Sequence, residues 1–231
     1  MSSSTRWSLV ALVALVGVVV ALVSTLGGSD GDSSAARSGD TGGTTLSSQA
    51  APPPGGPPAD EPITVVDPDT RATVDLPECR DSAVAATTDG PVAGLMVRCM
   101  DDGSTTTLGK IQAGKPMVVN MWAYWCEPCR RELPAIQDAA ATLGDEVRVV
   151  VSHTDPSETK GFDTLGALGV DELISVSDQE EELPTILGAP PVLPLTLFVR
   201  ADGTVAHVLV QPMYSEQDVL DAVAEYLGVT A

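Results

Sequence analysis

The chain has 231 residues, enough for one domain of ordinary size with appendages but not for two full domains. Acidic residues outnumber basic ones 32 to 12, the formal net charge is -20, and no dense Lys/Arg run is present, so we exclude nucleic acid as an expected partner. Hydrophobic residues make up 43% of the chain, enough for a packed core, and four cysteines are too few for a disulfide-rich scaffold.

An uncharged apolar segment of eighteen residues covers positions 9–26. Its length is close to the roughly 20 residues that span a bilayer core as a helix. Arg6 precedes it and Asp30 follows it, so the positive-inside rule places residues 1–8 in the cytoplasm and the remainder of the chain outside. We expect an uncleaved, single-pass signal-anchor. The alternative is a cleaved signal peptide, whose apolar region is usually ~7–15 residues long and ends in a small-x-small site that is missing here.

Residues 27–61 consist mainly of Gly, Ser, Pro, Ala and Thr, with Leu46 as the only large apolar side chain. Such a segment cannot bury enough surface to offset the entropy of ordering. Residues 52–58, PPPGGPP, should be locally extended and stiff. We therefore expect a disordered linker that holds the folded part away from the membrane.

Strand and helix patterns alternate in the rest of the chain, where we expect an N-terminal extension over 62–90 and a domain over 91–231. Residues 117–122 form a short apolar run typical of a strand buried on both faces. After this strand, the pattern predicts a helix from Cys126 to a stop at Gly144, a strand over 147–152 and a helix over 157–169. It then predicts a hairpin with strands 195–200 and 204–210, and a final helix that begins after Ser215. This order predicts an α/β fold with a central mixed β-sheet flanked by helices.

Cys126 and Cys129 form a Cys-x-x-Cys motif at the start of the predicted helix. A thiol-disulfide oxidoreductase needs one thiolate that attacks and a second thiol close enough to resolve the mixed disulfide. At the first helical turn, unpaired N–H groups and the helix dipole stabilise an anion, so we expect Cys126 to be the exposed nucleophile. Cys129, one turn further on, should be more buried and should resolve.

A structural zinc site is one alternative interpretation of the motif, and a purely structural disulfide is another. Zinc would require a second Cys-x-x-Cys or a histidine pair at ligand spacing, whereas His153 and His207 are isolated. We expect both histidines to have satisfied side chains and no role. No metal and no cofactor are expected.

Residues 114–134, GKPMVVNMWAYWCEPCRRELP, closely resemble the active-site segment of the TlpA/ResA-type thioredoxin-like disulfide reductases. The resemblance extends through residues 192–199, VLPLTLFV, and covers roughly residues 91–231. It implies a thioredoxin-like fold, partners that carry thiols or disulfides, and a membrane electron donor. Members of this family commonly carry an N-terminal anchor and work outside the cytoplasmic membrane.

The resemblance also implies roles for single residues. Pro194 would be the cis-proline packed against the redox disulfide, and Leu193 would offer backbone groups to an extended substrate. Pro134 stands where the family kinks its active-site helix. Trp125 and Pro128 are expected to form an apolar platform for the partner.

The direction of electron transfer must come from the surroundings of the cysteines. Many thioredoxins have a buried aspartate six residues before the first cysteine, but Asn120 occupies that position here. Glu127 resembles the CEPC motif of the ResA-type proteins that keep apocytochrome c thiols reduced. An acid beside the nucleophile disfavours the thiolate and makes the couple more reducing, although Glu127 is equally well interpreted as an ordinary first-turn acid.

We therefore expect a reductase of extracytoplasmic protein disulfides, with cytochrome c maturation as a candidate pathway. The alternatives are an oxidant that forms disulfides in secreted proteins and a non-catalytic module that binds, for instance, copper.

Cys79 and Cys99 remain after the motif is assigned. In an oxidising compartment two leftover cysteines usually pair, so we expect a structural disulfide that fastens the N-terminal extension to the domain. In the chain-entropy model it would contribute about 3 kcal/mol. A second redox pair that feeds Cys126 is the alternative. The acidic surplus is spread along the chain, and we interpret it as favouring solubility rather than binding.

Overall fold

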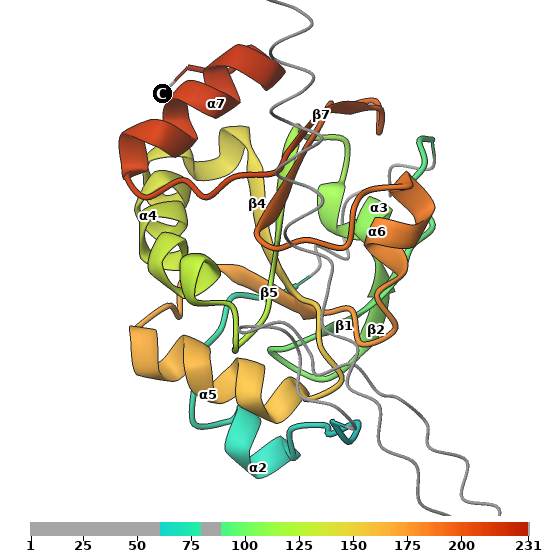
Figure 1. The fold of residues 1–231 in the computed structure, drawn as a ribbon, viewed down its shortest axis with the longest axis vertical. Coiled ribbons are helices and arrows are strands. Elements are labelled where there is room, and N and C mark those ends of the chain that lie inside the picture. Colours follow the sequence, from blue (N-terminus) through green and yellow to red (C-terminus); the bar gives the residue numbers. More distant parts are fainter. Residues whose placement is uncertain (1–60, 80–88, 231) are drawn as a thin grey trace, which may run out of the picture. The chain divides into compact units, whose positions relative to one another are not determined.

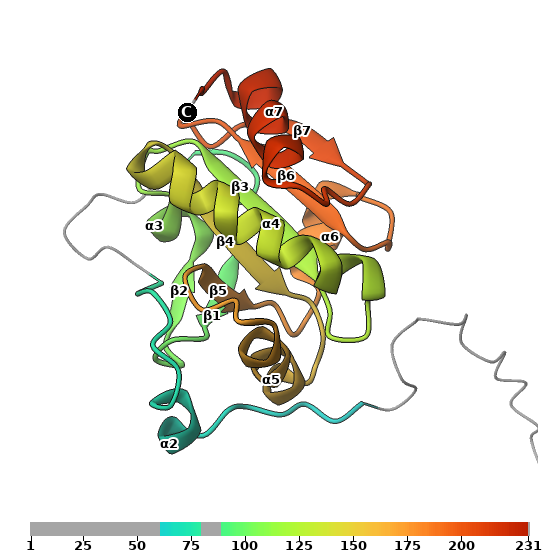
Figure 2. The same cartoon turned by 90° about the vertical axis from the view of Figure 1, so that its left-hand side faces the viewer.

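The computed structural model describes residues 61–79 and 89–230, which include a seven-stranded sheet in the order β2-β1-β5-β4-β3-β6-β7 (Figures 1 and 2). The strands are β1 (Met96–Cys99), β2 (Thr105–Thr107), β3 (Met117–Trp122), β4 (Arg148–His153), β5 (Ile174–Ser177), β6 (Leu195–Val199) and β7 (Val205–Leu209). β3, β4 and β5 run parallel, whereas β6, β7 and the β1–β2 hairpin pair antiparallel. The predicted mixed sheet is confirmed.

Helices cover both faces of this sheet, because β3 to β6 carry apolar side chains on both sides. The helices are α2 (Pro68–Arg71), α3 (Leu108–Gln112), α4 (Glu127–Leu143), α5 (Glu158–Leu168), α6 (Glu182–Leu187) and α7 (Glu216–Leu227), with a 3₁₀ turn, η1 (Gly144–Glu146). Buried side chains of α4, α5 and α7 form one core with one face of the sheet. Those of α3 and α6 form a second core on the other face (Figure 2).

The predicted elements are confirmed with ends that differ by one or two residues. The last helix begins after Ser215 as predicted, with a capping box in which Ser215 Oγ accepts the Asp218 N–H and the Asp218 carboxylate accepts the Ser215 N–H. Gly144 caps α4 with a φ of 53°, a conformation that costs glycine little. The β1–β2 hairpin, β5 and the short helices α2, α3 and α6 were not predicted from the sequence.

A buried ion pair holds the N-terminal extension against α5. Arg71, at the end of α2, lies 2.7 Å from the carboxylate of Glu158 on α5, and both side chains are buried. The guanidinium also donates to the carbonyl oxygens of Val66 and Met100. Since removing one partner of such a pair leaves an uncompensated buried charge, this contact fixes the extension on α5.

Among the described residues, no helix combines the length and the apolar character needed to cross a bilayer. The anchor predicted over 9–26 and nearly all of the linker predicted over 27–61 lie outside the described residues.

Candidate active site

The Cys-x-x-Cys pair lies at the N-terminus of α4. Cys126 is the N-cap residue and Cys129 lies in the first turn; a disulfide joins them, with a Cα–Cα distance of 5.3 Å. The Cys126 sulfur also accepts the N–H of Cys129 at 3.3 Å. Helix N–H groups therefore surround the position where a thiolate would form, and they favour the anion.

The two sulfurs differ less in exposure than the sequence analysis expected. In this disulfide form Cys126 is 4% exposed and Cys129 is fully buried. Cys126 is therefore buried rather than exposed as the motif predicted, although it keeps a small exposed fraction that Cys129 lacks. Its role as the attacking thiol stays a prediction.

Trp125 precedes Cys126 directly, and Leu193 and Pro194 lead into β6. The Leu193–Pro194 peptide bond is cis, and Pro194 is buried. Trp125 and Leu193 pack against the apolar cluster that contains both cysteines, and they line the same cavity of about 400 Å³. Two segments far apart in sequence, the active-site loop and the residues before β6, therefore line one apolar cavity, and its use as a landing surface for a partner stays a prediction.

The orientation of Trp125 is fixed by a buried carboxylate. Its Nε1 donates to Asp155 at 2.9 Å, and the other Asp155 oxygen accepts the Ser157 N–H at 2.8 Å. Asp155 is 1% exposed, and this burial raises the pKa of its carboxyl group. This partner could not be predicted from the sequence, because no local pattern connects positions 125 and 155.

A buried acid that the sequence analysis missed lies one turn beyond Cys129. Glu132 is fully buried; its carboxylate accepts from the Asn120 side chain at 2.8 Å and from the Met213 N–H at 3.0 Å. Burial raises the pKa of Glu132 to about 7, against the lowering effect of these hydrogen bonds. The spacing could have revealed it, since residues three apart on a helix share a face and Cys129 faces the core.

Glu127 and Pro128 complete the motif at the helix surface. Pro128 is half-buried in the first turn. The Glu127 side chain is 66% exposed and lies 3.6 Å from the Arg130 guanidinium. Solvent and this neighbouring cation screen its charge, which weakens the expected influence on Cys126.

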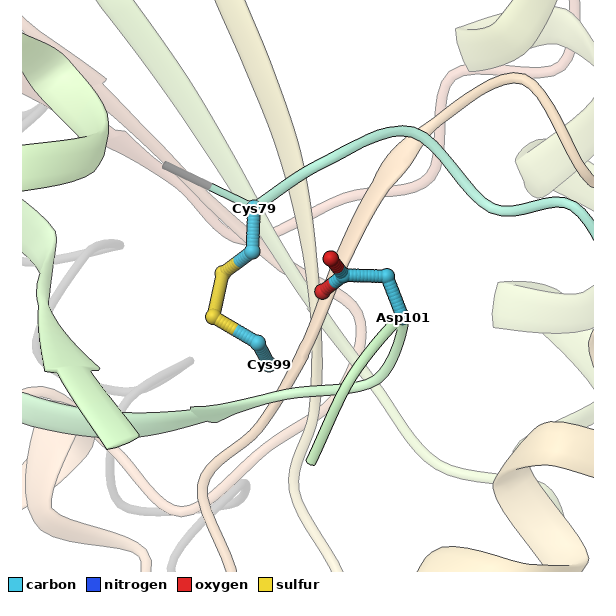
Figure 3. Close-up of side chains that lie close together, drawn as sticks. All are labelled: Cys79, Cys99 and Asp101. Atoms are coloured by element: carbon cyan, nitrogen blue, oxygen red, sulfur yellow. A yellow bond between two sulfur atoms is a disulfide. The ribbon is translucent and has the colours of Figure 1, made fainter. Parts of the chain in front are cut away.

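A second disulfide joins Cys79, in the N-terminal extension, to Cys99 at the end of β1 (Figure 3). Both are buried in the core on the α3 and α6 face, whereas Cys126 and Cys129 belong to the opposite core. The Asp101 carboxylate points toward this disulfide (Figure 3), and burial raises its pKa, with a further increase from Asp102. These three residues are the only group of potential metal ligands in the part of the chain that the structure describes, but both sulfurs are engaged in the disulfide.

The expectation of a satisfied His153 is wrong. The residue is buried at the end of β4, against the rings of Trp122 and Tyr124, and neither ring nitrogen has a hydrogen-bond partner among the described residues. Burial lowers its pKa to about 3, so the imidazole is neutral at physiological pH. His207, in contrast, stacks on Tyr226 with ring centroids 4.0 Å apart.

Comparison with known proteins agrees with this geometry. The sequence profile of the Redoxin family matches residues 75–225. The chain is 28% identical over 117 residues to the thiol-disulfide oxidoreductase ResA of Oceanobacillus iheyensis, a match that covers 47% of this chain and 55% of ResA. It is 26% identical over 146 residues to the thiol:disulfide interchange protein DsbE of Allochromatium vinosum, covering 61% of this chain and 77% of DsbE.

Solved structures show the same fold at low sequence identity. The structure of MTB DsbF aligns with a TM-score of 0.52 and 23% identity, over 60% of this chain and 99% of DsbF. That similarity concerns the fold alone. The match to ResA spans only about half the length of that relative.

Proposed function

The chain belongs to the Redoxin family of thioredoxin-fold thiol-disulfide oxidoreductases, and from this premise we propose that it reduces protein disulfides on the outer side of a cytoplasmic membrane. The observation that carries the proposal is the position of Cys126 and Cys129, joined by a disulfide at the N-terminus of α4. Membrane anchoring rests on the apolar segment over 9–26.

In the first step, the Cys126 thiolate attacks one sulfur of the substrate disulfide. A bond forms between Cys126 and that sulfur, the substrate S–S bond breaks, and the second substrate sulfur leaves as a thiolate that takes a proton from water. The helix N–H groups lower the cost of the attacking anion. Trp125 and Leu193 give the partner an apolar surface next to the reacting sulfur.

In the second step, Cys129 attacks the Cys126 sulfur and releases the reduced substrate, which re-forms the Cys126–Cys129 disulfide. Cys129 is fully buried and must lose its proton before it attacks. Glu132, one turn away, with a pKa of about 7, is suited to accept that proton at neutral pH. Asn120 donates to Glu132, so it positions the acid rather than replacing it.

Two observations support reduction over oxidation. The matched relatives include ResA, and the CEPC motif of the chain resembles that of the ResA-type proteins. A reductase of this kind uses up two electrons per cycle, so a membrane electron donor must restore the dithiol. Cytochrome c maturation is the process that we propose for it.

The reduction potential of the cysteine pair tests the direction. The full chain in detergent is equilibrated with dithiol buffers, and the reduced fraction is counted by mass after alkylation. A value near or below about -270 mV supports a reductase, and a value near about -120 mV would instead indicate an oxidant of secreted proteins. Insulin reduction by the same sample tests activity directly. If a Cys126→Ser variant still supported cytochrome c maturation, the result would instead favour a non-catalytic binding module, for instance for copper.

A further inference from the structure

A cavity of about 400 Å³ lies next to Trp125, the residue that precedes Cys126, and its walls come from three parts of the chain. One wall is Trp125 from the active-site loop, and another is the segment that leads to the cis peptide. The third is α6 with the residues around it. The apolar lining consists of Met121, Trp125, Pro184, Ala189, Pro190, Pro191, Val192, Leu193 and Leu195.

Three polar residues interrupt this apolar lining: Thr154, Glu181 and Thr185, whose hydroxyl donates to the Glu181 carbonyl oxygen at 3.2 Å. Thr154 is 5% exposed, and its Oγ1 has no hydrogen-bond partner among the described residues, although it lines the cavity. Glu181 lines the cavity from the N-cap position of α6, with a φ of 53°. A buried hydroxyl without a partner costs free energy, so this group points to a polar ligand atom inside the cavity.

Two carboxyl groups, those of Asp178 and Asp155, act on Glu181 at the cavity. Burial raises the pKa of Glu181, and the charges of Asp178 and Asp155 raise it further. None of the three makes an ion pair within the described ranges, and Lys160, whose charge acts on Asp155, is already paired with Glu61 at 2.7 Å. Glu181 therefore experiences the negative charge of two neighbouring carboxyl groups, and a cation would relieve this repulsion.

We propose that this cavity binds a Lys or Arg side chain of the disulfide-bearing partner polypeptide, carried near the cysteine that Cys126 attacks. The aliphatic stem would lie along Trp125 and the prolines, and the charged end would reach Glu181 and the Thr154 hydroxyl. The inference rests on the proposed function, because it names the substrate class of the same site: disulfides flanked by basic residues.

Matched peptides test the inference. Each peptide carries one cysteine in a disulfide with 2-nitro-5-thiobenzoate. The peptides form sets of three that are identical except for Lys, norleucine or Glu at one position, and each of the four positions that flank the cysteine is varied in turn. Cys126 of the reduced full chain attacks the peptide sulfur, the peptide–nitrothiobenzoate bond breaks, and the coloured thiolate leaves. Cys129 then attacks the Cys126 sulfur and releases the peptide thiol, so the second-order rate is read from the colour.

For at least one position, we expect the Lys peptide to react about tenfold faster than the Glu peptide at low salt, with norleucine between them. Glu181→Gln should lower this ratio about threefold or more, and high salt should lower it too. The matched control is Glu182→Gln, which removes the same charge from α6 at a residue outside the cavity lining, and it should leave the ratio nearly unchanged. Thr154→Val should slow the Lys peptide more than the norleucine peptide, whereas a purely structural effect would slow both equally.

Two outcomes separate this inference from the proposed function. If wild type reacts with all three peptides at equal rates, or if Glu182→Gln changes the ratio as much as Glu181→Gln, the basic-residue site is wrong while thiol exchange stands. If wild type reacts with none of them, the proposed function itself fails.

Discussion

The two disulfides of this protein form the same covalent bond in opposite surroundings. Cys126 and Cys129 are separated by three positions and begin a helix, whereas Cys79 and Cys99 are separated by twenty and join the N-terminal extension to β1. The first closes a ring too small to constrain much chain. The second closes a loop long enough to restrict the unfolded chain.

Electrostatics separates the two pairs as well. Helix N–H groups surround Cys126, and the dipole of α4 favours its thiolate. Cys79 and Cys99 instead have the Asp101 carboxylate beside them (Figure 3), which disfavours a thiolate in either residue. Position in the fold and neighbouring charge, rather than the covalent bond itself, therefore favour exchange at one disulfide and a structural role at the other.

The largest effect is expected when one cysteine of the redox pair is removed, which tests the roles assigned to the two disulfides. Cys126→Ser should lower insulin reduction by about a thousandfold or more, because no other described thiol group begins a helix. Turbidity of reduced insulin measures the rate. If Cys126→Ser kept substantial activity and Cys99→Ser lost it, the roles assigned to the two disulfides would be reversed.

Removing the other disulfide should affect stability rather than activity. The double substitution Cys79→Ala/Cys99→Ala is expected to lower the free energy of unfolding by about 3 kcal/mol, because the loop of twenty residues is no longer closed in the unfolded state. Urea unfolding of the full chain measures the loss, and insulin reduction in the absence of denaturant serves as the control. A large loss of activity without unfolding would mean that this pair relays electrons to Cys126.

This division of roles could be predicted from the sequence only in part. The redox motif, the mixed sheet and the strands with long apolar runs follow from local patterns, since β3 and β4 are buried along their length. β2 and β5 have only three and four residues, too few for a periodic signal, and their pairing depends on contacts distant in the chain. The same limit concealed the Asp155–Trp125 contact and the cavity wall at α6, which only tertiary structure brings to the cysteines.

A buried acid with a raised pKa also accompanies the redox pair, because Glu132 lies one turn beyond Cys129 and has a pKa of about 7. Glu132→Gln should slow the release of substrate from the mixed disulfide by about tenfold at pH 7, since Cys129 loses its proton acceptor. In wild type this step should accelerate as pH rises through about 7, where Glu132 loses its own proton. Stopped-flow tryptophan fluorescence against pH measures the step.

Stability gives a second readout for Glu132. Its pKa in the folded protein is raised above the ordinary value of 4.5, so its stabilising contribution is complete at low pH and is lost as pH rises from about 4.5 to 7. Glu132→Gln should lack this part of the pH dependence of the unfolding free energy. A pH profile of substrate release unchanged by the substitution would exclude Glu132 as the proton acceptor.

The smallest expected effect concerns Glu127, the acid between the two cysteines. Its side chain is 66% exposed and is 3.6 Å from Arg130, so solvent and the guanidinium screen its charge from Cys126. Glu127→Gln should therefore move the reduction potential by less than about 10 mV, and the pair Glu127→Gln/Arg130→Gln should move it little more. Equilibration with dithiol buffers resolves such a shift. A change of about 30 mV or more in the single variant would show that the exposed carboxylate, and not the helix N-terminus, sets the reduction potential of the redox pair. The difference between this pair and Cys79–Cys99 would then depend on side-chain charge alone.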